Sequence, residues 1–348
     1  MNNNIIIRAD GGNLIGLGHV MRMIVLAKEL SKLNKVLFLC RSSNLNKDRF
    51  QSGIEVIKKN GFSVIEISEE NVIGDIINAQ KKYKAELIIT DSYEVDEEYF
   101  NALRSYFKYT GYVDDINKLE MNVDFLINQN FKAEYIDYSK NVKLNTKLFL
   151  GSQYCMLREE FRTEYFKGNR NSENVEDVLI TLGGMDNDYN TLKILKQIEG
   201  CKINIHVVVG VAFDKTLNDE LMHISSVASN IFLHTNPNMS ELMNKCGIAI
   251  SACGSTLYEL CAMKVPTIGI VIADNQEWLG KQMCEEGAIL GGKWIWDHKH
   301  GELKDLLNKL ITNKEVRENI IKIQSNLINK NGVRLLKEEI EKIMIRGL

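Results

Sequence analysis

A histidine follows a glycine-rich turn near the start of the chain, in the stretch IIIRADGGNLIGLGHVMRMIVLAKEL. The apolar run before the turn predicts a strand, and the periodic apolar residues after it predict a helix. Glycines permit positive φ angles and close backbone approach, and a helix start offers free N–H groups. The turn contains Gly11, Gly12, Gly16 and Gly18. This pattern predicts an anion site in which His19 lies beside a bound phosphate or sugar.

The glycine spacing does not match the two best-known phosphate-binding loops. It is not G-x-G-x-x-G, and it lacks the lysine of a P-loop. At this stage His19 has two interpretations. It is either a functional group at the ligand or a buried, hydrogen-bonded histidine that closes the helix start.

Three loops of the second half have the composition of a nucleotide diphosphate site. They are TLGGMDND with Gly183 and Gly184, SACGSTLYEL with Gly254, Ser255 and Thr256, and IADNQEW with Asn275 and Gln276. Backbone N–H groups and the two hydroxyls can bind phosphate, and Glu259 one turn further on can accept hydrogen bonds from ribose. The alternative is that Ser255 and Thr256 only cap a helix and that Glu259 is a solvated helix residue.

The composition is that of an ordinary globular protein. The chain has 348 residues, of which 45% are hydrophobic and 26% charged, and its net charge is −3. This balance argues against nucleic acid and membrane partners. No apolar stretch approaches the roughly 20 residues that span a bilayer, and the N-terminus lacks the features of a signal peptide. We therefore expect a cytoplasmic protein with no obligate protein partner.

The cysteines and histidines do not form a metal-binding pattern. The seven cysteines are scattered singly, without a C-x-x-C pair, as expected of reduced thiols. His298 and His300 lie close together in DHKHGE, but no third ligand follows at a typical spacing. We expect neither a metal site nor a cofactor.

Short β-branched runs alternate with amphipathic segments in both halves, which is typical of βαβ units around parallel sheets. The polar segment 167–177, KGNRNSENVED, reads as a linker. We predict a Rossmann-like domain over 1–166, a second over 178–331, and a helix over 332–348 that could return to the first domain. Because parallel strands share their carboxyl edge, Asp91, Asp114 and Asn128 should lie along one rim.

Several motifs in a fixed order resemble the UDP-sugar hydrolases of pseudaminic acid biosynthesis, the PseG family. The motifs are RADGGNLIGLGHVMR, DSYEVDEEY, YVDD, LINQN, LGSQYCMLREEF, LITLGGMDND, ACGSTLYELCAMKVPTIGI and ADNQ. The resemblance covers nearly the whole chain. It implies an α/β protein of the glycosyltransferase B (GT-B) fold, related to MurG-type glycosyltransferases, with two Rossmann-like domains whose parallel sheets face a central cleft.

The resemblance also assigns roles to single residues. His19 matches the histidine that is the family's proposed general base, and Tyr93 matches the tyrosine of an Asp-His-Tyr loop. Glu259 matches a ribose-binding acidic residue, and Asn275 lies in a loop near the sugar. The chain departs from the pattern at Ser92, where the family often has histidine. This difference concerns the recognition of the sugar, whose stereochemistry and acyl pattern the sequence does not reveal.

The chemistry of UDP release fits a single base. UDP departs as a stable anion, so no acid has to protonate it, and His19 can deprotonate a water that attacks the anomeric carbon. One displacement of this kind inverts the anomeric centre and needs no metal. The sequence suggests Asp10 as the group that orients the imidazole, without placing its carboxylate. Two alternatives stay open: a GT-B glycosyltransferase with a UDP-sugar donor, and a non-catalytic UDP-sugar-binding protein.

Overall fold

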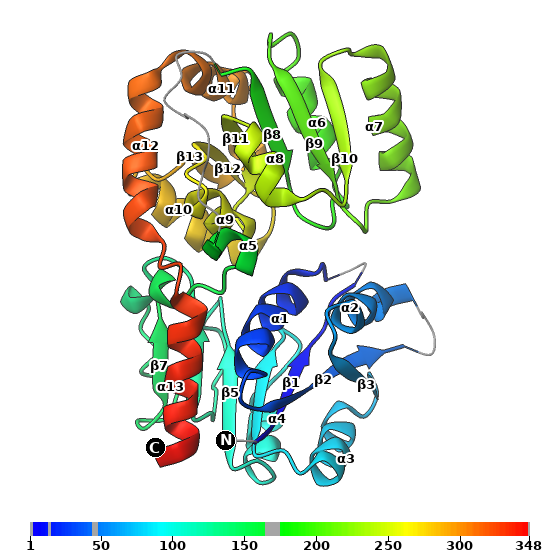
Figure 1. Cartoon of the computed structure of the whole chain (residues 1–348), viewed down its shortest axis with the longest axis vertical. Helices are drawn as coiled ribbons and strands as arrows, with labels where there is room; N and C mark the ends of the chain where they lie inside the picture. Colours follow the sequence, from blue (N-terminus) through cyan, green and yellow to red (C-terminus); the bar gives the residue numbers. More distant parts are fainter. Residues whose placement is uncertain (1–2, 13–14, 44–47, 164–174, 347–348) are drawn as a thin grey trace. The chain divides into compact units, whose positions relative to one another are not determined.

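The computed structural model describes residues 3–12, 15–43, 48–163 and 175–346. The chain divides into two units, of which unit 1 comprises Met1–Leu157 with Asn331–Leu348 and unit 2 comprises Arg158–Lys330 (Figure 1). The boundary thus follows Leu157, whereas the sequence pattern predicts a first domain over 1–166. Helix α5 (Glu159–Thr163) accordingly belongs to unit 2. Most of the predicted linker 167–177 lies outside the described residues.

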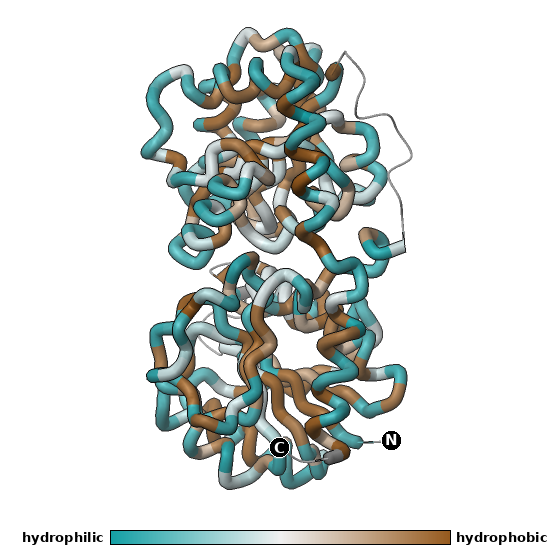
Figure 2. The backbone as a smooth tube through the Cα atoms, turned by 90° about the vertical axis from the view of Figure 1, so that its left-hand side faces the viewer, coloured by the Kyte–Doolittle hydropathy of each residue, from teal (hydrophilic) through white to brown (hydrophobic). Residues whose placement is uncertain are grey.

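Unit 1 is built on a parallel sheet in the order β3-β2-β1-β4-β5-β6-β7. Strands β1, β4, β5 and β6 are buried along almost their whole length, because helices cover both faces of a parallel sheet. Figure 2 shows these strands as the hydrophobic centre of the unit. The strands are β1 (Asn4–Ala9), β2 (Lys35–Ser42), β3 (Ser63–Ser68), β4 (Leu87–Asp91), β5 (Tyr109–Val113), β6 (Phe125–Asn128) and β7 (Lys147–Leu150).

The helices of unit 1 pack into two apolar cores, one on each face of the sheet. One core joins α1, α2 and α13 to the sheet, and it includes Val333, Leu336 and Ile340 of the last helix with no exposed surface. The other core packs α3 and α4 on the opposite face. The helices are α1 (Gly18–Leu30), α2 (Asp48–Lys59), α3 (Val72–Tyr83), α4 (Glu97–Arg104) and α13 (Gly332–Arg346), with short 3₁₀ turns η1 (Ala133–Tyr135) and η2 (Ser152–Tyr154).

Unit 2 repeats the arrangement with a parallel sheet in the order β10-β9-β8-β11-β12-β13. Its strands are β8 (Asp177–Thr181), β9 (Asn204–Val209), β10 (Ile231–Thr235), β11 (Ile248–Ala252), β12 (Thr267–Val271) and β13 (Leu290–Trp294). Its other helices are α6 (Asn190–Gln197), α7 (Lys215–Val227), α8 (Met239–Lys245), α9 (Thr256–Ala262), α10 (Glu277–Glu285), α11 (Glu302–Thr312) and α12 (Lys314–Leu327), with η3 (Asp274–Gln276) and η4 (Ile295–Asp297).

The β-branched runs of the second half do not mark strand β13. The strand contains Gly291 and Gly292, both at positive φ, so its sequence LGGKW has little of the β-branched character that marks a strand.

The predicted α/β fold with two parallel sheets is confirmed. In both sheets the chain order reverses beside the first strand, between β1 and β4 and between β8 and β11. Ligands of open α/β sheets bind at such a point, outside the carboxyl ends of the strands. Asp91 ends β4, while Gly183 and Gly254 follow β8 and β11 within two residues. The fold therefore brings predicted site residues to the two places where a ligand is expected.

Candidate active site

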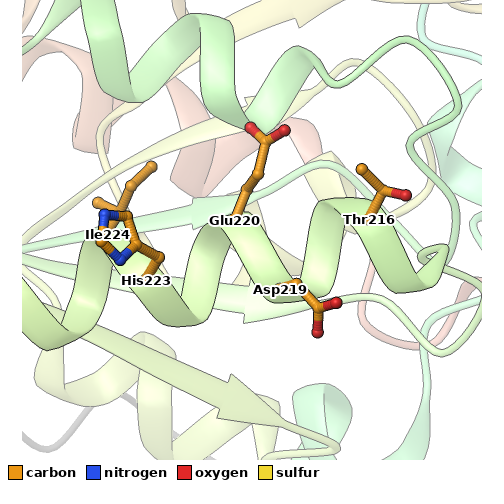
Figure 3. Close-up of a pocket in the computed structure, with 5 residues that line it drawn as sticks. All are labelled: Thr216, Asp219, Glu220, His223 and Ile224. Atoms are coloured by element: carbon orange, nitrogen blue, oxygen red, sulfur yellow. The ribbon is translucent and has the colours of Figure 1, made fainter.

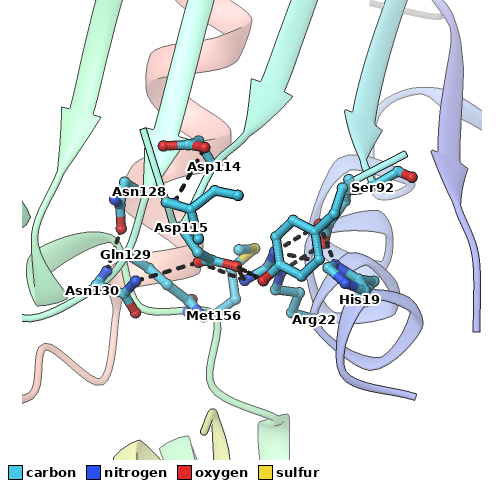
Figure 4. A network of polar contacts seen from close by, with 12 residues as sticks. His19, Arg22, Ser92, Asp114, Asp115, Asn128, Gln129, Asn130 and Met156 are labelled. Carbon is cyan, nitrogen blue, oxygen red and sulfur yellow. Dashed lines mark hydrogen bonds and ion pairs between the residues drawn. The ribbon is translucent and has the colours of Figure 1, made fainter. Parts of the chain in front are cut away.

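His19 lies in the first turn of α1 and is hydrogen-bonded to the last residue of β4. The Nδ1 atom of His19 is 2.6 Å from Oδ1 of Asp91, whose side chain has no exposed surface. Arg22, one turn along α1, holds the same carboxylate from the other side. Its Nε donates to Oδ2 and its Nη2 to Oδ1, both over 2.6 Å. Figure 4 shows His19 and Arg22 on one side of a polar network that continues through Asp115.

The charges around Asp91 determine which nitrogen of His19 is free. Burial by itself would raise the pKa of Asp91, but the charges and hydrogen bonds of Arg22 and His19 outweigh it and hold that pKa well below its usual range. The ionised carboxylate can only accept a hydrogen bond, so Nδ1 of His19 carries the proton. The lone pair of a neutral imidazole is then on Nε2. The side chain of His19 is 12% exposed, which leaves it accessible at the sheet edge.

Tyr93 packs against His19 and is held in place through Asp115. The two rings meet edge to face with their centroids 4.6 Å apart. The Tyr93 hydroxyl donates to Asp115 over 2.6 Å, and Arg22 contacts the same carboxylate over 2.9 Å. Burial and the charge of Asp115 raise the pKa of Tyr93 far above its usual range, so the phenol stays protonated. Tyr93 therefore positions the histidine and keeps its own proton, which it donates to Asp115.

Asp10 does not orient the imidazole in the structure, as the sequence had suggested. Its carboxylate accepts from the backbone N–H and Nε of Arg41 over 2.8 and 2.9 Å, and it pairs with Arg8 over 2.7 Å. The orienting carboxylate is Asp91, because the strand order places β4 directly beside β1 and brings its final residue under α1.

The glycines of the first loop have different structural roles. A Cβ on Gly12 would lie 1.7 Å from the carbonyl oxygen of Arg49 in α2, and Gly16 has φ +71°. Gly12 and Gly16 also exchange backbone hydrogen bonds of 3.0 and 2.9 Å across the loop. Gly18 is different, because a Cβ there would meet nothing within 4 Å and its φ is not in the positive region. Packing does not require glycine at position 18, which leaves room for a ligand beside His19.

Polar side chains from neighbouring strands extend the network along the rim. Tyr138 donates to Asp114 over 2.6 Å and accepts from Asn128 over 2.8 Å. Ser92 stands where the family often has histidine, and its hydroxyl accepts from the backbone of Glu94 within the same loop. The predicted rim residues Asp91, Asp114 and Asn128 end or follow β4, β5 and β6, and Figure 4 shows the latter two near Asp115.

The three predicted nucleotide loops of unit 2 lie after strands of its sheet. Gly183 has φ +103°, which favours glycine, and a Cβ on Gly254 would meet only Nε2 of Gln276, at 3.9 Å. Two of the three loops therefore approach each other. The Ser255 side chain is exposed and makes no capping hydrogen bond, whereas Asp186 caps α6 through its contacts to two backbone N–H groups. Of the remaining predicted residues, Gly184 lies in the first loop, Thr256 begins α9, and Asn275 lies in η3.

Glu259 is not the solvated helix residue of the alternative interpretation. It is buried in α9 and forms two hydrogen bonds with Arg158, from Nε to Oε1 over 2.7 Å and from Nη2 to Oε2 over 2.8 Å. The sequence did not predict three residues that contribute to these networks: Arg22, Asp115 and Arg158. Two signals could have found them: all three residues lie in motifs that carry the family resemblance, and Arg22 follows His19 by three residues in an otherwise apolar stretch.

One surface hollow of unit 2 lies away from these loops. A pocket of about 400 Å³ is bounded by Thr216, Asp219, Glu220, His223 and Ile224. All five residues belong to α7, along which they are spread in Figure 3, so the hollow is an open helix surface. Within the described ranges, no cluster of three or more histidine, cysteine or acidic residues could hold a metal ion. In the same part of the chain, no helix is both long and apolar enough to cross a bilayer.

Comparison with known proteins supports the expected resemblance. The chain is 28% identical over 288 residues to the UDP-2,4-diacetamido-2,4,6-trideoxy-β-L-altropyranose hydrolase of Campylobacter jejuni, covering 81% of this chain and 97% of the relative. The resemblance to these hydrolases is confirmed. The chain is also 29% identical over 280 residues to an uncharacterized protein of Methanocaldococcus jannaschii, covering 76% of this chain. It spans only about half, 54%, of that relative's length.

The structural comparison confirms the GT-B fold. The crystal structure of Acinetobacter baumannii MurG superimposes with a TM-score of 0.66 and 12% identity, over 98% of this chain and 99% of that one. At this identity the similarity concerns the fold alone. No protein-family model matches the chain.

Proposed function

We propose that this protein is a hydrolase that releases UDP from a UDP-2,4-diacetamido-2,4,6-trideoxy sugar, in the biosynthesis of a nonulosonic acid of the pseudaminic type. The observation that carries the proposal is the hydrogen bond from His19 Nδ1 to the buried Asp91, which leaves Nε2 as a base at the rim of the sheet. The similarity to the Campylobacter hydrolase supports the choice of substrate.

In the proposed reaction, Nε2 of His19 takes a proton from water while the water oxygen bonds to the anomeric carbon. The bond between that carbon and the phosphate oxygen breaks, and its electron pair leaves with UDP. The products are UDP and the free sugar with inverted anomeric configuration. The imidazolium that forms is stabilised by Asp91, and a general base of this kind typically contributes about 10²- to 10⁴-fold to the rate.

The loops around Gly183, Gly254 and Gln276 are proposed to hold the UDP. Well-placed N–H donors stabilise the charge that grows on a leaving diphosphate by a few kcal/mol each. No metal is part of this proposal. The cytoplasmic location and the absence of an obligate protein partner remain predictions from the sequence.

Product analysis in ¹⁸O-labelled water tests the proposal. The chain is incubated with UDP-2,4-diacetamido-2,4,6-trideoxy-altropyranose, and the label is expected in the sugar. Label in UDP would mean attack at phosphorus and would contradict the mechanism. The same assay with added sugar acceptors distinguishes the alternatives, because a glycosyltransferase forms a glycoside and a binding protein releases no UDP.

A further inference from the structure

The ion pair between Arg158 and Glu259 fixes the plane of one carboxylate in unit 2. Two roughly parallel N–H···O bonds of 2.7 and 2.8 Å join the guanidinium to both carboxylate oxygens. Bidentate pairs of this kind add directional precision to their energy. The side chains are 30% and 10% exposed, so the pair is largely protected from water.

Arg158 is itself held by several neighbours. Its guanidinium carbon lies 4.8 Å from the ring centroid of Phe161, and Nη1 is 3.0 Å from a carboxylate oxygen of Glu160. Burial alone would lower the pKa of Arg158, but the hydrogen bonds and charge of Glu259 outweigh it, so that the pKa is raised. The guanidinium therefore stays charged and offers Glu259 a fixed partner.

The pairing leaves acceptor capacity on Glu259. An ionised carboxylate has about four lone-pair positions, and Arg158 occupies one on each oxygen. Two positions remain, one per oxygen, and they match the two hydroxyls of a vicinal diol. Glu259 lies one turn into α9, and the loop before this helix contains Gly254, where a Cβ would meet only Nε2 of Gln276, at 3.9 Å. A ligand can thus approach this part of unit 2.

We propose that Arg158 is a positioning residue for nucleotide selection, which orients Glu259 to accept hydrogen bonds from both ribose hydroxyls of the nucleotide. This inference rests on the proposed function, since it assumes that UDP binds in unit 2. It predicts that the protein distinguishes UDP from 2′-deoxy-UDP, and that Arg158 sets this preference without contacting the reacting atoms.

Calorimetric titration of the full chain with UDP and 2′-deoxy-UDP tests the inference. A hydrogen bond to a charged group is worth enough for the wild type to bind UDP about 10-fold or more tightly than the deoxy analogue. Arg158→Lys keeps the charge but not the two-point contact, and Arg158→Gln removes the charge as well. In both variants, and in Glu259→Gln, the two affinities are expected to fall within about threefold of each other, well below that hydrogen-bond preference.

Glu160→Gln is the matched control, because it removes the other carboxylate near Arg158 and leaves the pair with Glu259 intact. This variant is expected to keep the wild-type preference. Thermal melts of all variants establish that each one is folded, and Arg158→Lys supplies the measurement if Arg158→Gln fails to fold.

Two results would overturn this inference and leave the proposed function intact. If the Arg158 variants melt earlier but keep the preference for UDP, the pair only fastens α5 to α9. If they lose UDP and 2′-deoxy-UDP affinity equally, Arg158 acts on the diphosphate or the base. A wild-type protein that binds neither nucleotide would instead contradict the proposed function itself.

Discussion

At the scale of single residues, the proposed chemistry depends on which nitrogen of His19 carries the proton. The buried Asp91 accepts from Nδ1, and Arg22 keeps that carboxylate ionised. A histidine with this arrangement has its second nitrogen available for a proton from water. In the proposed mechanism this nitrogen is the general base, a role that the glycine-rich turn before His19 does not by itself imply.

Replacing His19 by asparagine should separate catalysis from folding. Asparagine keeps a similar shape and can still hydrogen-bond, but it cannot take up a proton. We expect turnover to fall about 10²- to 10⁴-fold while UDP affinity and the melting temperature change little. Steady-state kinetics, UDP calorimetry and a thermal melt check this. Turnover close to wild type with a lowered melting temperature would identify a purely structural histidine.

Asp91 should make the stability of the protein sensitive to acid. Its pKa is depressed in the folded chain, whereas the pKa of an unfolded aspartate is about 3.9. Above that pH both states are ionised and the full contribution of the ion pair is present. As the pH falls below it, the unfolded chain binds a proton that folded Asp91 does not accept, so the stability is lost progressively.

Urea unfolding of wild type and Asp91→Asn between pH 6 and pH 3 measures this effect. The variant leaves the Arg22 charge without one of its partners and should lose about 3–5 kcal/mol at neutral pH. Its stability should then decline less steeply on acidification than that of the wild type. Parallel pH profiles for the two proteins would mean that Asp91 has the same pKa folded and unfolded.

At the scale of elements, the loop between β1 and α1 packs against α2, and the start of α1 belongs to the proposed binding site. Gly12 lies against the backbone of α2, while Gly18 faces open space. The two glycines therefore predict opposite outcomes for the same substitution, and each serves as the control of the other.

Gly12→Ala should destabilise the protein, because its Cβ would lie 1.7 Å from the carbonyl oxygen of Arg49 and α2 would have to move. Overpacking of this kind typically costs about 1–3 kcal/mol. Gly18→Ala should leave stability unchanged or raise it by up to about 1 kcal/mol, but raise KM if the sugar approaches this backbone. Denaturant curves and kinetics on both variants test this. An unaltered KM in Gly18→Ala would remove that position from the binding site.

The elements themselves were largely predictable where their patterns are regular. Strands such as IIIRA and LIITD are short apolar runs, and the helix after His19 has a continuous apolar face. Strand β13 was missed because its glycines remove the pattern. The first domain boundary differs from the prediction because α5 packs against α9 of unit 2, a contact that polarity along the chain does not encode.

At the scale of the whole molecule, the last helix completes the core of the first unit. Leu336 of α13 has no exposed surface and belongs to the same core as Ile5 and Val20. Leu336→Ala should therefore destabilise the protein by about 2–5 kcal/mol, whereas Ile345→Ala, whose side chain is 55% exposed on the same helix, should have little effect. Thermal and urea unfolding of the two variants measures the difference. Equal losses would contradict the placement of α13.

Chelation provides a second test at this scale. The proposed mechanism uses His19 as the base and N–H groups for the diphosphate, and the described residues contain no three-ligand metal cluster. UDP release is therefore expected to be unchanged after exhaustive treatment with EDTA and dialysis. Loss of activity that a divalent cation restores would show that the diphosphate needs a metal.

The sequence by itself determined the fold class, and it indicated the glycine-rich loops and His19 as the candidate base, because glycine spacing and apolar periodicity are local properties of the chain. The partners of the site residues were decided only by the tertiary structure. His19 and Asp91 are 72 residues apart, and Arg158 and Glu259 are 101 residues apart. Such pairs depend on the order of strands in each sheet and on the packing of helices, so the carboxylate that orients His19 is Asp91 and not the nearby Asp10.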